Sequence, residues 1–249
     1  MRRDWLIVVV IWAALTAIME YVIFTWSMLP EGYAREAEIV NEAYVLLLAM
    51  GAPVFGFMLA MMGYSIVRFR GTGDPTEDGP PMAGSRRVIG AWLAITSALT
   101  LAVLINPGFV GLADIRGTSS ADMVVEMEGQ RWTWKATYEN GAVSNDELVL
   151  PVHSRIRFDV TSTDVLHSFW IPGFAMKIDA VPGRTTEMFV TTERLGDYAD
   201  DFNVRVQCAE LCGLSHGDMA MPVRVVEQAE FDAWLAELST TEAASGDGS

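Results

Sequence analysis

The sequence contains few of the residues that form crosslinks or large metal sites. It has two cysteines and three histidines, and its only lysines are Lys135 and Lys177. Two cysteines exclude a scaffold held together by several disulfides, and three histidines exclude a protein with several histidine-rich metal centres. Basic residues are outnumbered by acidic ones, and the net charge is 17 − 32 = −15. This charge repels phosphate and therefore excludes nucleic-acid binding.

The acidic and the apolar residues lie in different parts of the chain. Residues 1–117 contain 8 basic and 10 acidic side chains, a balance of −2, whereas residues 118–249 contain 9 and 22, a balance of −13. The whole chain is 51% hydrophobic. A nearly neutral apolar part followed by an acidic part indicates a membrane anchor attached to a domain in water.

Three long apolar runs occupy the first part, namely Trp5–Leu29, Tyr44–Val67 and Val88–Ile105. Each has about 18–25 residues, the length of a helix that crosses a bilayer. Arginines favour the cytoplasmic side. They precede the first run and flank the loop at about 68–87, whereas the loop between the first two runs has one. The sequence therefore predicts a cytoplasmic N-terminus and a transmembrane hairpin over 44–117, with the rest of the chain outside.

The first apolar run leaves two interpretations open. Residues 1–43 are either an additional span with an outer loop or a signal segment, for which Ala34 and Ala37 offer cleavage sites. The run is longer than the apolar core of most signals and contains Glu20, which favours a retained helix. Between the second and third runs, the glycine- and proline-rich residues 71–81 are predicted to form a flexible connector.

Alternation of apolar and polar residues begins after Gly117 and predicts a β-sandwich or barrel over 118–238. The expected strands are Asp122–Glu128, Arg131–Tyr138, Glu147–Val152, Arg155–Ser162, Thr185–Val190, Asn203–Gln207 and Met221–Val226. A short amphipathic helix, Glu227–Leu238, is expected to follow. The small, polar tail 239–249 is expected to be disordered. The predicted fold class is thus a membrane-anchored all-β protein.

Both cysteines lie within five residues of each other, and further possible metal ligands surround them. The candidate set is Cys208, Cys212, His216, Met219 and, upstream, His167. Two thiolates, two imidazoles and one thioether form a soft set that favours copper, and the backbone carbonyl of Glu210 can turn toward the same point. A single metal ion has little use for so many donors, whereas two coppers bridged by two thiolates would use all of them.

Other interpretations of the two cysteines explain less of the pattern. A disulfide between Cys208 and Cys212 is common outside the cell, but it gives the nearby histidine and methionine no role. A mononuclear blue-copper site needs only one cysteine, and a thioredoxin-like copper chaperone needs strands that alternate with helices. A zinc site would not call for a thioether. His153 has no comparable neighbours and is interpreted as an ordinary strand or loop residue.

The spacing Cys208-x-Glu210-x-Cys212-x₃-His216-x₂-Met219 resembles the binuclear copper (CuA) motif of cytochrome c oxidase subunit II. The resemblance covers most of the chain from about Tyr44 onward. Three more stretches resemble the family in the same order: Gly129-Gln130-Arg131-Trp132-Thr-Trp134, Asp164-Val-Leu-His167-Ser and Lys177-Ile-Asp179-Ala-Val-Pro182-Gly183-Arg184. The resemblance implies a cupredoxin-like domain on the outer face of the cell membrane.

The resemblance also implies the ligands of each metal. Cys208 and Cys212 would both bridge two coppers. His167 and Met219 would complete one copper, and His216 and the carbonyl oxygen of Glu210 would complete the other. The carboxylate of Glu210 would reach a magnesium ion shared with the catalytic subunit, subunit I.

Trp132, expected on the strand Arg131–Tyr138, would be the surface aromatic residue through which electrons enter. Asp146, Glu147 and Asp164 are the acids expected around it, on a face that would attract a basic donor. The donor would be cytochrome c or, in a salt-rich setting, a small copper protein.

The function implied is that of the electron-accepting subunit of a cytochrome c oxidase. It would pass single electrons to subunit I, which reduces O₂ and pumps protons. The alternatives are the CuA-containing subunit of a nitric oxide reductase and a membrane-anchored copper carrier, which would not need Trp132. Quinol oxidase subunits of this fold have typically lost the copper ligands, and three histidines cannot build the second cluster of nitrous oxide reductase. Two features depart from the family: the additional first span, and the lack of a proton-channel glutamate near Arg86–Trp92.

Overall fold

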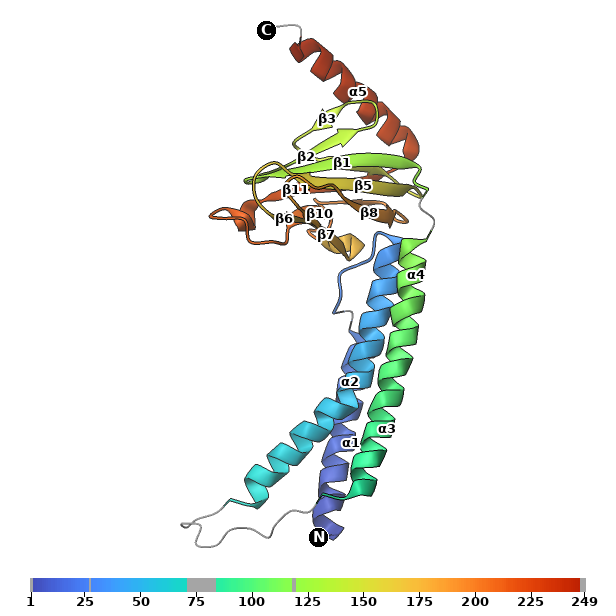
Figure 1. Cartoon of the computed structure of the whole chain (residues 1–249), viewed down its shortest axis with the longest axis vertical. Coiled ribbons are helices and arrows are strands. Elements are labelled where there is room, and N and C mark those ends of the chain that lie inside the picture. Colours follow the sequence, from blue (N-terminus) through green and yellow to red (C-terminus); the bar gives the residue numbers. More distant parts are fainter. Residues whose placement is uncertain (1, 27, 71–83, 118–119, 247–249) are drawn as a thin grey trace. The chain divides into compact units, whose positions relative to one another are not determined.

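The computed structural model describes residues 2–26, 28–70, 84–117 and 120–246. They form two compact units, one of Met1–Met28 with Glu42–Ala113 and one of Leu29–Asn41 with Asp114–Ser249. Figure 1 labels the elements of both. The connector predicted over 71–81 lies outside the described residues.

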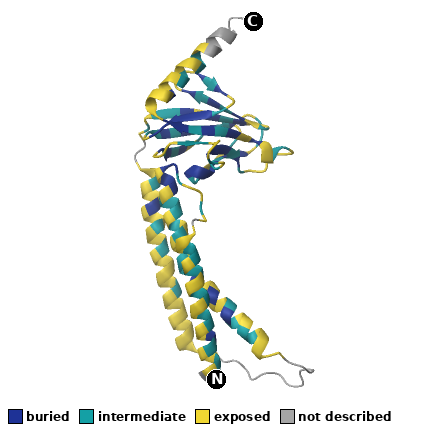
Figure 2. Cartoon of the chain, turned by 180° about the vertical axis from the view of Figure 1, so that it is seen from behind, coloured by how far each residue is buried: buried dark blue, intermediate teal, exposed yellow. Residues whose placement is uncertain are grey.

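The first unit is made of long apolar helices. They are α1 (Arg2–Thr25), α2 (Arg35–Arg68), α3 (Arg86–Val103), the π-helical turn η1 (Leu104–Phe109) and α4 (Val110–Arg116). Three stretches, Arg3–Thr25, Arg35–Arg68 and Arg86–Arg116, are long and apolar enough to cross a membrane. Most of their residues are exposed or intermediate (Figure 2), and the exposed ones include many large apolar side chains, which suits lipid and not water. The prediction of three apolar helices before a β-rich domain is confirmed.

Specific contacts pair α1 with α2. The indole Nε1 of Trp12 donates to the carbonyl oxygen of Pro53 at 2.7 Å, and the hydroxyl of Tyr64 donates to Asp4 Oδ1 at 2.6 Å. A Cβ on Gly56 would lie 3.0 Å from Thr16 Oγ1, so this glycine allows the two helices to approach closely. The first apolar run is thus an integral partner of the second in this structure.

The second unit contains eleven strands among the described residues. They are β1 (Met123–Gln130), β2 (Thr133–Tyr138), β3 (Val143–Ser144), β4 (Leu148–Pro151), β5 (Arg155–Ser162), β6 (His167–Ile171), β7 (Met176–Ala180), β8 (Thr186–Thr191), β9 (Gly196–Asp197), β10 (Arg205–Cys208) and β11 (Ala220–Val226). One sheet has the order β3-β2-β1-β5-β8, and the other has β4-β11-β10-β6-β7, with β9 beside β11. The two sheets form the predicted cupredoxin-like sandwich (Figure 1).

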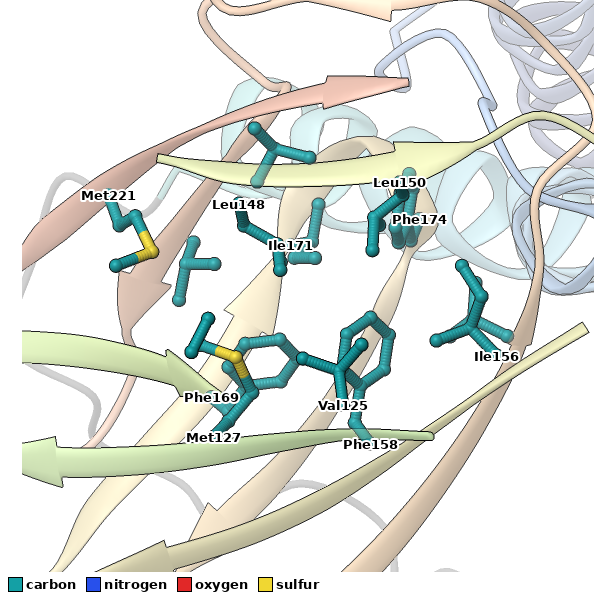
Figure 3. Close-up of a cluster of buried hydrophobic side chains, with 14 of the residues drawn as sticks. Val125, Met127, Leu148, Leu150, Ile156, Phe158, Phe169, Ile171, Phe174 and Met221 are labelled. Atoms are coloured by element: carbon teal, nitrogen blue, oxygen red, sulfur yellow. The ribbon is translucent and has the colours of Figure 1, made fainter. Parts of the chain in front are cut away.

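The core lies between the two sheets and follows from the alternation in the sequence. Figure 3 shows Val125 and Met127 of β1 and Phe158 of β5 opposite Phe169 of β6 and Leu148 of β4. All five side chains are 0% exposed, and the rings of Phe158 and Phe169 lie 5.0 Å apart. Burial of each such side chain stabilises the fold by roughly 1.5–3 kcal/mol.

The structure also differs from the sequence prediction at several elements. Strands β3, β6, β7 and β9 were not expected. β6 is buried on nearly every residue, so it lacks the alternation that reveals a strand with one exposed face. Helix α5 (Gln228–Gly246) continues through most of the tail 239–249 that was expected to be disordered. The tail contains Ala and Glu, which favour a helix once one has started.

Candidate metal centre

Three elements bring the candidate ligands to one end of the sandwich. His167 begins β6, Cys208 ends β10, and Met219 directly precedes β11. Since β10 pairs with both β6 and β11, the ends of these strands must meet. The backbone N–H of Cys208 donates to the carbonyl of Met219 at 3.0 Å, and that of Ala209 donates to the carbonyl of Ser168 at 2.9 Å. The loop that carries Cys212 and the short helix η3 (His216–Asp218) crosses between these strands.

The donor atoms converge on the two sulfur atoms, which lie 3.7 Å apart. The Sγ of Cys208 is 3.8 Å from His167 Nδ1 and 3.2 Å from the carbonyl oxygen of Glu210. The Sγ of Cys212 is 3.6 Å from His216 Nδ1 and 3.8 Å from Met219 Sδ. All the predicted ligand atoms are therefore gathered around one pair of thiols.

The two cysteines do not form a disulfide, because an S–S bond is about 2.05 Å long. Both side chains are buried. Burial, with the neighbouring Cys208 thiol, raises the pKa of the Cys212 thiol to about 11. A metal that binds these sulfurs must therefore displace their protons.

This donor set suits copper. His167, Cys208 and Cys212 place their ligand atoms within 4.8 Å of one another. Thiolate, imidazole and thioether are ligands that copper prefers over harder metals. His167 and Met219 are 0% exposed, so the site is also shielded from water on their side.

Asp164 orients His167. Its Oδ1 lies 2.8 Å from His167 Nε2, which leaves Nδ1 free to face the sulfur. Its Oδ2 accepts from both the backbone N–H and the Nε of Arg131, at 3.0 and 2.9 Å. Burial favours the neutral carboxyl, but the hydrogen bonds from His167, Arg131 and Val165 outweigh it and hold the pKa of Asp164 well below its usual range.

Aromatic packing fixes the other side of the same imidazole. The ring of Trp134 contacts that of His167 edge-on, with centroids 6.1 Å apart. A Cβ on Gly129 would lie 3.0 Å from Trp134 and 3.2 Å from His167, so only glycine allows this approach. The resemblance pointed to this stretch of sequence, although it assigned no such role to Gly129.

Trp132 lies in the turn between β1 and β2 and not on the strand where it was expected. A Cβ on Gly213, whose φ is +127°, would lie 3.4 Å from the Trp132 ring, so the half-buried indole packs against the loop between Cys212 and His216. Its Nε1 is buried and has no hydrogen-bond partner among the described residues.

Two of the acids expected around Trp132 have other partners. Asp164 is engaged by Arg131 and His167. The Oε1 of Glu147 accepts from the Trp234 indole at 2.9 Å and lies 3.5 Å from Arg224. Trp234 packs on Tyr138, the last residue of β2, whereas Trp132 precedes its first residue. The placement of Glu147 beside Trp132 was therefore wrong.

Sequence reasoning missed an apolar rim around the ligands. Leu166, Leu211 and Leu214 are 50%, 78% and 95% exposed. Leu166 precedes His167, and the other two flank Cys212. The sequence did show leucines in a loop that carries ligands. Such residues typically mark contact surfaces when they are exposed.

Comparisons with known proteins point to the same family as the sequence motifs. A family model described as "Cytochrome C oxidase subunit II, periplasmic domain" matches residues 140–228. The chain is 26% identical over 281 residues to "Cytochrome c oxidase subunit 2" of Thermostichus vulcanus, covering 90% of this chain and 84% of that protein. It is 32% identical over 168 residues to the protein of the same name from Mycosarcoma maydis, covering 57% and 64%. Among solved structures, the periplasmic domain of subunit II of cytochrome oxidase from Bradyrhizobium japonicum is 30% identical, with a TM-score of 0.45, covering 50% of this chain and 99% of that one. The chain is similar to subunit II of cytochrome c oxidases over most of its length, which supports its being a subunit of an oxidoreductase.

Proposed function

We propose that this subunit accepts single electrons at a binuclear copper centre and passes them to the haem-copper catalytic subunit for O₂ reduction coupled to proton pumping. One observation carries the proposal: two unbonded thiols 3.7 Å apart are surrounded by two imidazole nitrogens, a thioether and a carbonyl oxygen. A mononuclear site would leave at least one of the sulfurs without a purpose.

The chain's own residues would hold the metals with little rearrangement. Cys208 and Cys212 would bridge them, His167 and Met219 would complete one copper, and His216 with the Glu210 carbonyl would complete the other. When bound, the copper pair supplies reversible storage of one electron. The surrounding strands keep the ligands in place, because the hydrogen bond between the backbones of Cys208 and Met219 closes the loop at its base. A site preorganised in this way favours rapid electron transfer.

Trp132 would be the place where electrons enter. Its indole is half-buried, so part of it faces solvent while the rest packs on the loop of Cys212. The domain's charge of −13 would attract a basic cytochrome c as donor, or a small copper protein where salt screens the charge. The exposed Leu211 and Leu214 would exclude water from a contact with a partner protein.

Glu210 would link the subunit to its catalytic partner. Its carbonyl faces Cys208, and its side chain is exposed. The carboxylate is therefore free to share a magnesium ion with subunit I, since hard cations prefer oxygen ligands. The distribution of arginines around the spans supports a position of this domain on the outer face of the plasma membrane.

The metal content of the purified protein tests the proposal. We expect two coppers per chain and an oxidised EPR spectrum in which one unpaired electron is shared by two copper nuclei. Cys212→Ser should abolish the shared spectrum, because a hydroxyl cannot replace a bridging thiolate. One copper per chain with a four-line mononuclear spectrum would contradict the binuclear centre.

The alternatives are separated by what the assembled complex reduces. A membrane-anchored copper carrier would release copper to a chelator or an acceptor protein and would not transfer electrons. A nitric oxide reductase would keep the same copper spectrum but would consume NO in place of O₂. Oxygen uptake and NO consumption with reduced cytochrome c, both measured on the complex that contains this chain, therefore decide among the three.

A further inference from the structure

The loop after the first span is packed into the outer domain. Leu29–Asn41, here called the strap, belongs to the same compact unit as Asp114–Ser249. Its residues Tyr33, Ala34 and Glu36 are only 5%, 2% and 1% exposed. A linker that merely joins two spans would be exposed and polar. The burial of these residues therefore indicates that the strap is part of the folded domain.

The ring of Tyr33 fills a socket made by two glycines. A Cβ on Gly173 would lie 2.9 Å from this ring, and a Cβ on Gly196 would clash with it. The Tyr33 hydroxyl donates to Asp201 Oδ2 at 3.1 Å, and the guanidinium of Arg194 lies over the ring, 5.4 Å from its centroid. The socket is thus shaped for this side chain.

The strap also covers the end of the edge strand β8. Ala34 forms an antiparallel bridge with Thr192, and the N–H of Glu193 donates to the carbonyl of Tyr33 at 3.0 Å. The N–H of Thr191 donates to Glu36 Oε2 at 2.8 Å. These contacts satisfy backbone groups that an edge strand would otherwise leave unpaired.

Arg155 joins the strap to the other segment that leads to a span. Its Nη1 lies 3.5 Å from Glu36 Oε1 and donates to Thr191 Oγ1 at 3.1 Å, while its Nη2 donates to the carbonyl of Arg116 at 3.2 Å. Glu36 belongs to the first turns of α2, and Arg116 is the last residue of α4. The side chain of Arg155 is 14% exposed and that of Glu36 is 1% exposed.

The residue after Arg116 is a glycine, which suits the backbone at this point. Gly117 has a φ of +45°, which glycine adopts at little cost. A Cβ at this position would also lie 3.1 Å from Arg155 Nη2. The local sequence is therefore compatible with a guanidinium held against the carbonyl of Arg116.

We propose that Glu36, Arg155 and Arg116 form a clamp that fixes the outer domain to both chain segments leading to its spans. Arg155 and Glu36 are positioning residues: they touch no metal ligand, and they act by holding the metal centre at a constant place relative to the membrane. The role in electron transfer rests on the proposed function, whereas the clamp itself does not.

The clamp adds non-covalent attachments between the domain and the two segments that lead to its spans. A domain tied by single covalent linkers can rotate about them, and electron transfer to an acceptor in another subunit depends on distance and orientation. The guanidinium of Arg155 on β5 contacts Glu36 of one segment and the carbonyl of Arg116 of the other, and it restricts this freedom because breaking the contacts would leave a nearly buried charge unpaired. Contacts that hold the two segments against β5 and β8 would thus keep the metal centre in a fixed orientation before electron transfer.

The test uses the assembled oxidase with three variants of the full chain. Arg155→Met removes the guanidinium, together with its contact over the Phe189 ring, but keeps an unbranched aliphatic side chain, and Glu36→Gln removes one charge. The matched control is Arg157→Met, two residues along the same strand. The Nε of Arg157 pairs with Asp159 Oδ1 of that strand at 2.9 Å, so no segment leading to a span depends on it.

Hydrogen exchange of the backbone amides at and just after the end of β8 reports directly on the clamp. We expect the amides of Thr191 and Glu193 to exchange about tenfold faster in Arg155→Met, by a smaller factor in Glu36→Gln and at the wild-type rate in Arg157→Met. The copper spectrum and the rate of reduction by the donor should be unchanged in all three. Transfer from the copper centre to the haem should slow by about tenfold in Arg155→Met, by a smaller factor in Glu36→Gln and not at all in Arg157→Met.

Each outcome has a distinct meaning. Wild-type exchange at Thr191 and Glu193 in both clamp variants would overturn the clamp. Faster exchange with normal transfer to the haem would overturn the positioning role. If Arg155→Met does not assemble, Glu36→Gln decides between the same results. A wild-type protein without a shared copper spectrum would contradict the proposed function, while the exchange measurement would still decide on the clamp.

Discussion

The side chains next to the ligands decide how well this site is organised. Asp164 accepts hydrogen bonds from His167 on one oxygen and from Arg131 on the other, so one carboxylate connects the imidazole to the turn that carries Trp132. The motif that predicted His167 also contains Asp164, yet the sequence suggested a docking role for it. Its contacts show an orienting role, which only the folded turn reveals.

Asp164→Asn should therefore weaken copper binding by roughly 10–100-fold, the usual cost of losing a carboxylate partner of a ligating histidine. The fold should persist, because Trp134 and Gly129 still confine the imidazole. Copper titration of the apo-protein with a competing chelator measures the affinity. The matched control, Asp159→Asn, removes a carboxylate that faces Arg157 and no ligand. Equal affinity of the Asp164 variant and the wild type would refute the orienting role.

Tyr33 makes the strap sensitive to alkaline pH. Burial and the adjacent Asp201 raise the pKa of Tyr33 from 10.0 to about 12. A group with a raised pKa stabilises the folded state fully below its unfolded pKa and loses that contribution as the pH rises through the folded pKa. The stabilisation, on the order of 2 kcal/mol, should thus be complete below pH 10 and lost by about pH 12.

The ionisation of Tyr33 can be measured by following tyrosinate absorbance against pH in the wild type and in Tyr33→Phe. The difference between the two curves is the titration of Tyr33. We expect the difference to titrate near pH 12 and the strap to loosen over the same interval in the wild type alone. A difference curve centred at pH 10 would show that Tyr33 is not buried in its socket.

At the scale of elements, local patterns predicted more than distant contacts did. The strand expected over Arg155–Ser162 is β5, because strict alternation marks a strand with one buried face. The ligand loop could be predicted since its spacing is local. The strap could not, because Tyr33 and Gly196 are far apart in the sequence and nothing in either segment specifies the other.

The strap also bears on whether the first span is retained. Cleavage after Ala34 would remove Tyr33, and cleavage after Ala37 would also remove Glu36, so each would empty a socket that the domain has formed. We expect the intact mass of the subunit, isolated from membranes, to include α1. A mature N-terminus at residue 35 or 38 would contradict this expectation.

At the scale of the whole molecule, the acidic charge of the outer domain has two uses. Some carboxylates would attract the proposed donor, and others are structural. Glu147 belongs to the second group, since it accepts from Trp234 of α5 and pairs with Arg224 of β11. Glu147→Gln should therefore lower the free energy of unfolding by about 1 kcal/mol, and it should leave the salt dependence of donor association unchanged. Thermal unfolding and stopped-flow mixing at several ionic strengths measure the two effects.

Trp132 should behave in the opposite way, because its half-buried indole reaches the surface where we propose that the donor binds. Its ring packs on Gly213 of the ligand loop, and it contributes no donor atom to the metals. Trp132→Ala should therefore slow reduction of the copper centre by a large factor, while the copper content, the EPR spectrum and the salt dependence of donor association remain those of the wild type. Trp134→Phe is the contrasting variant: that ring supports His167 from within the core, so its loss should disturb the spectrum first. If Trp132→Ala lowered the copper content, or if reduction proceeded at the normal rate, Trp132 would be a packing residue and electrons would enter elsewhere.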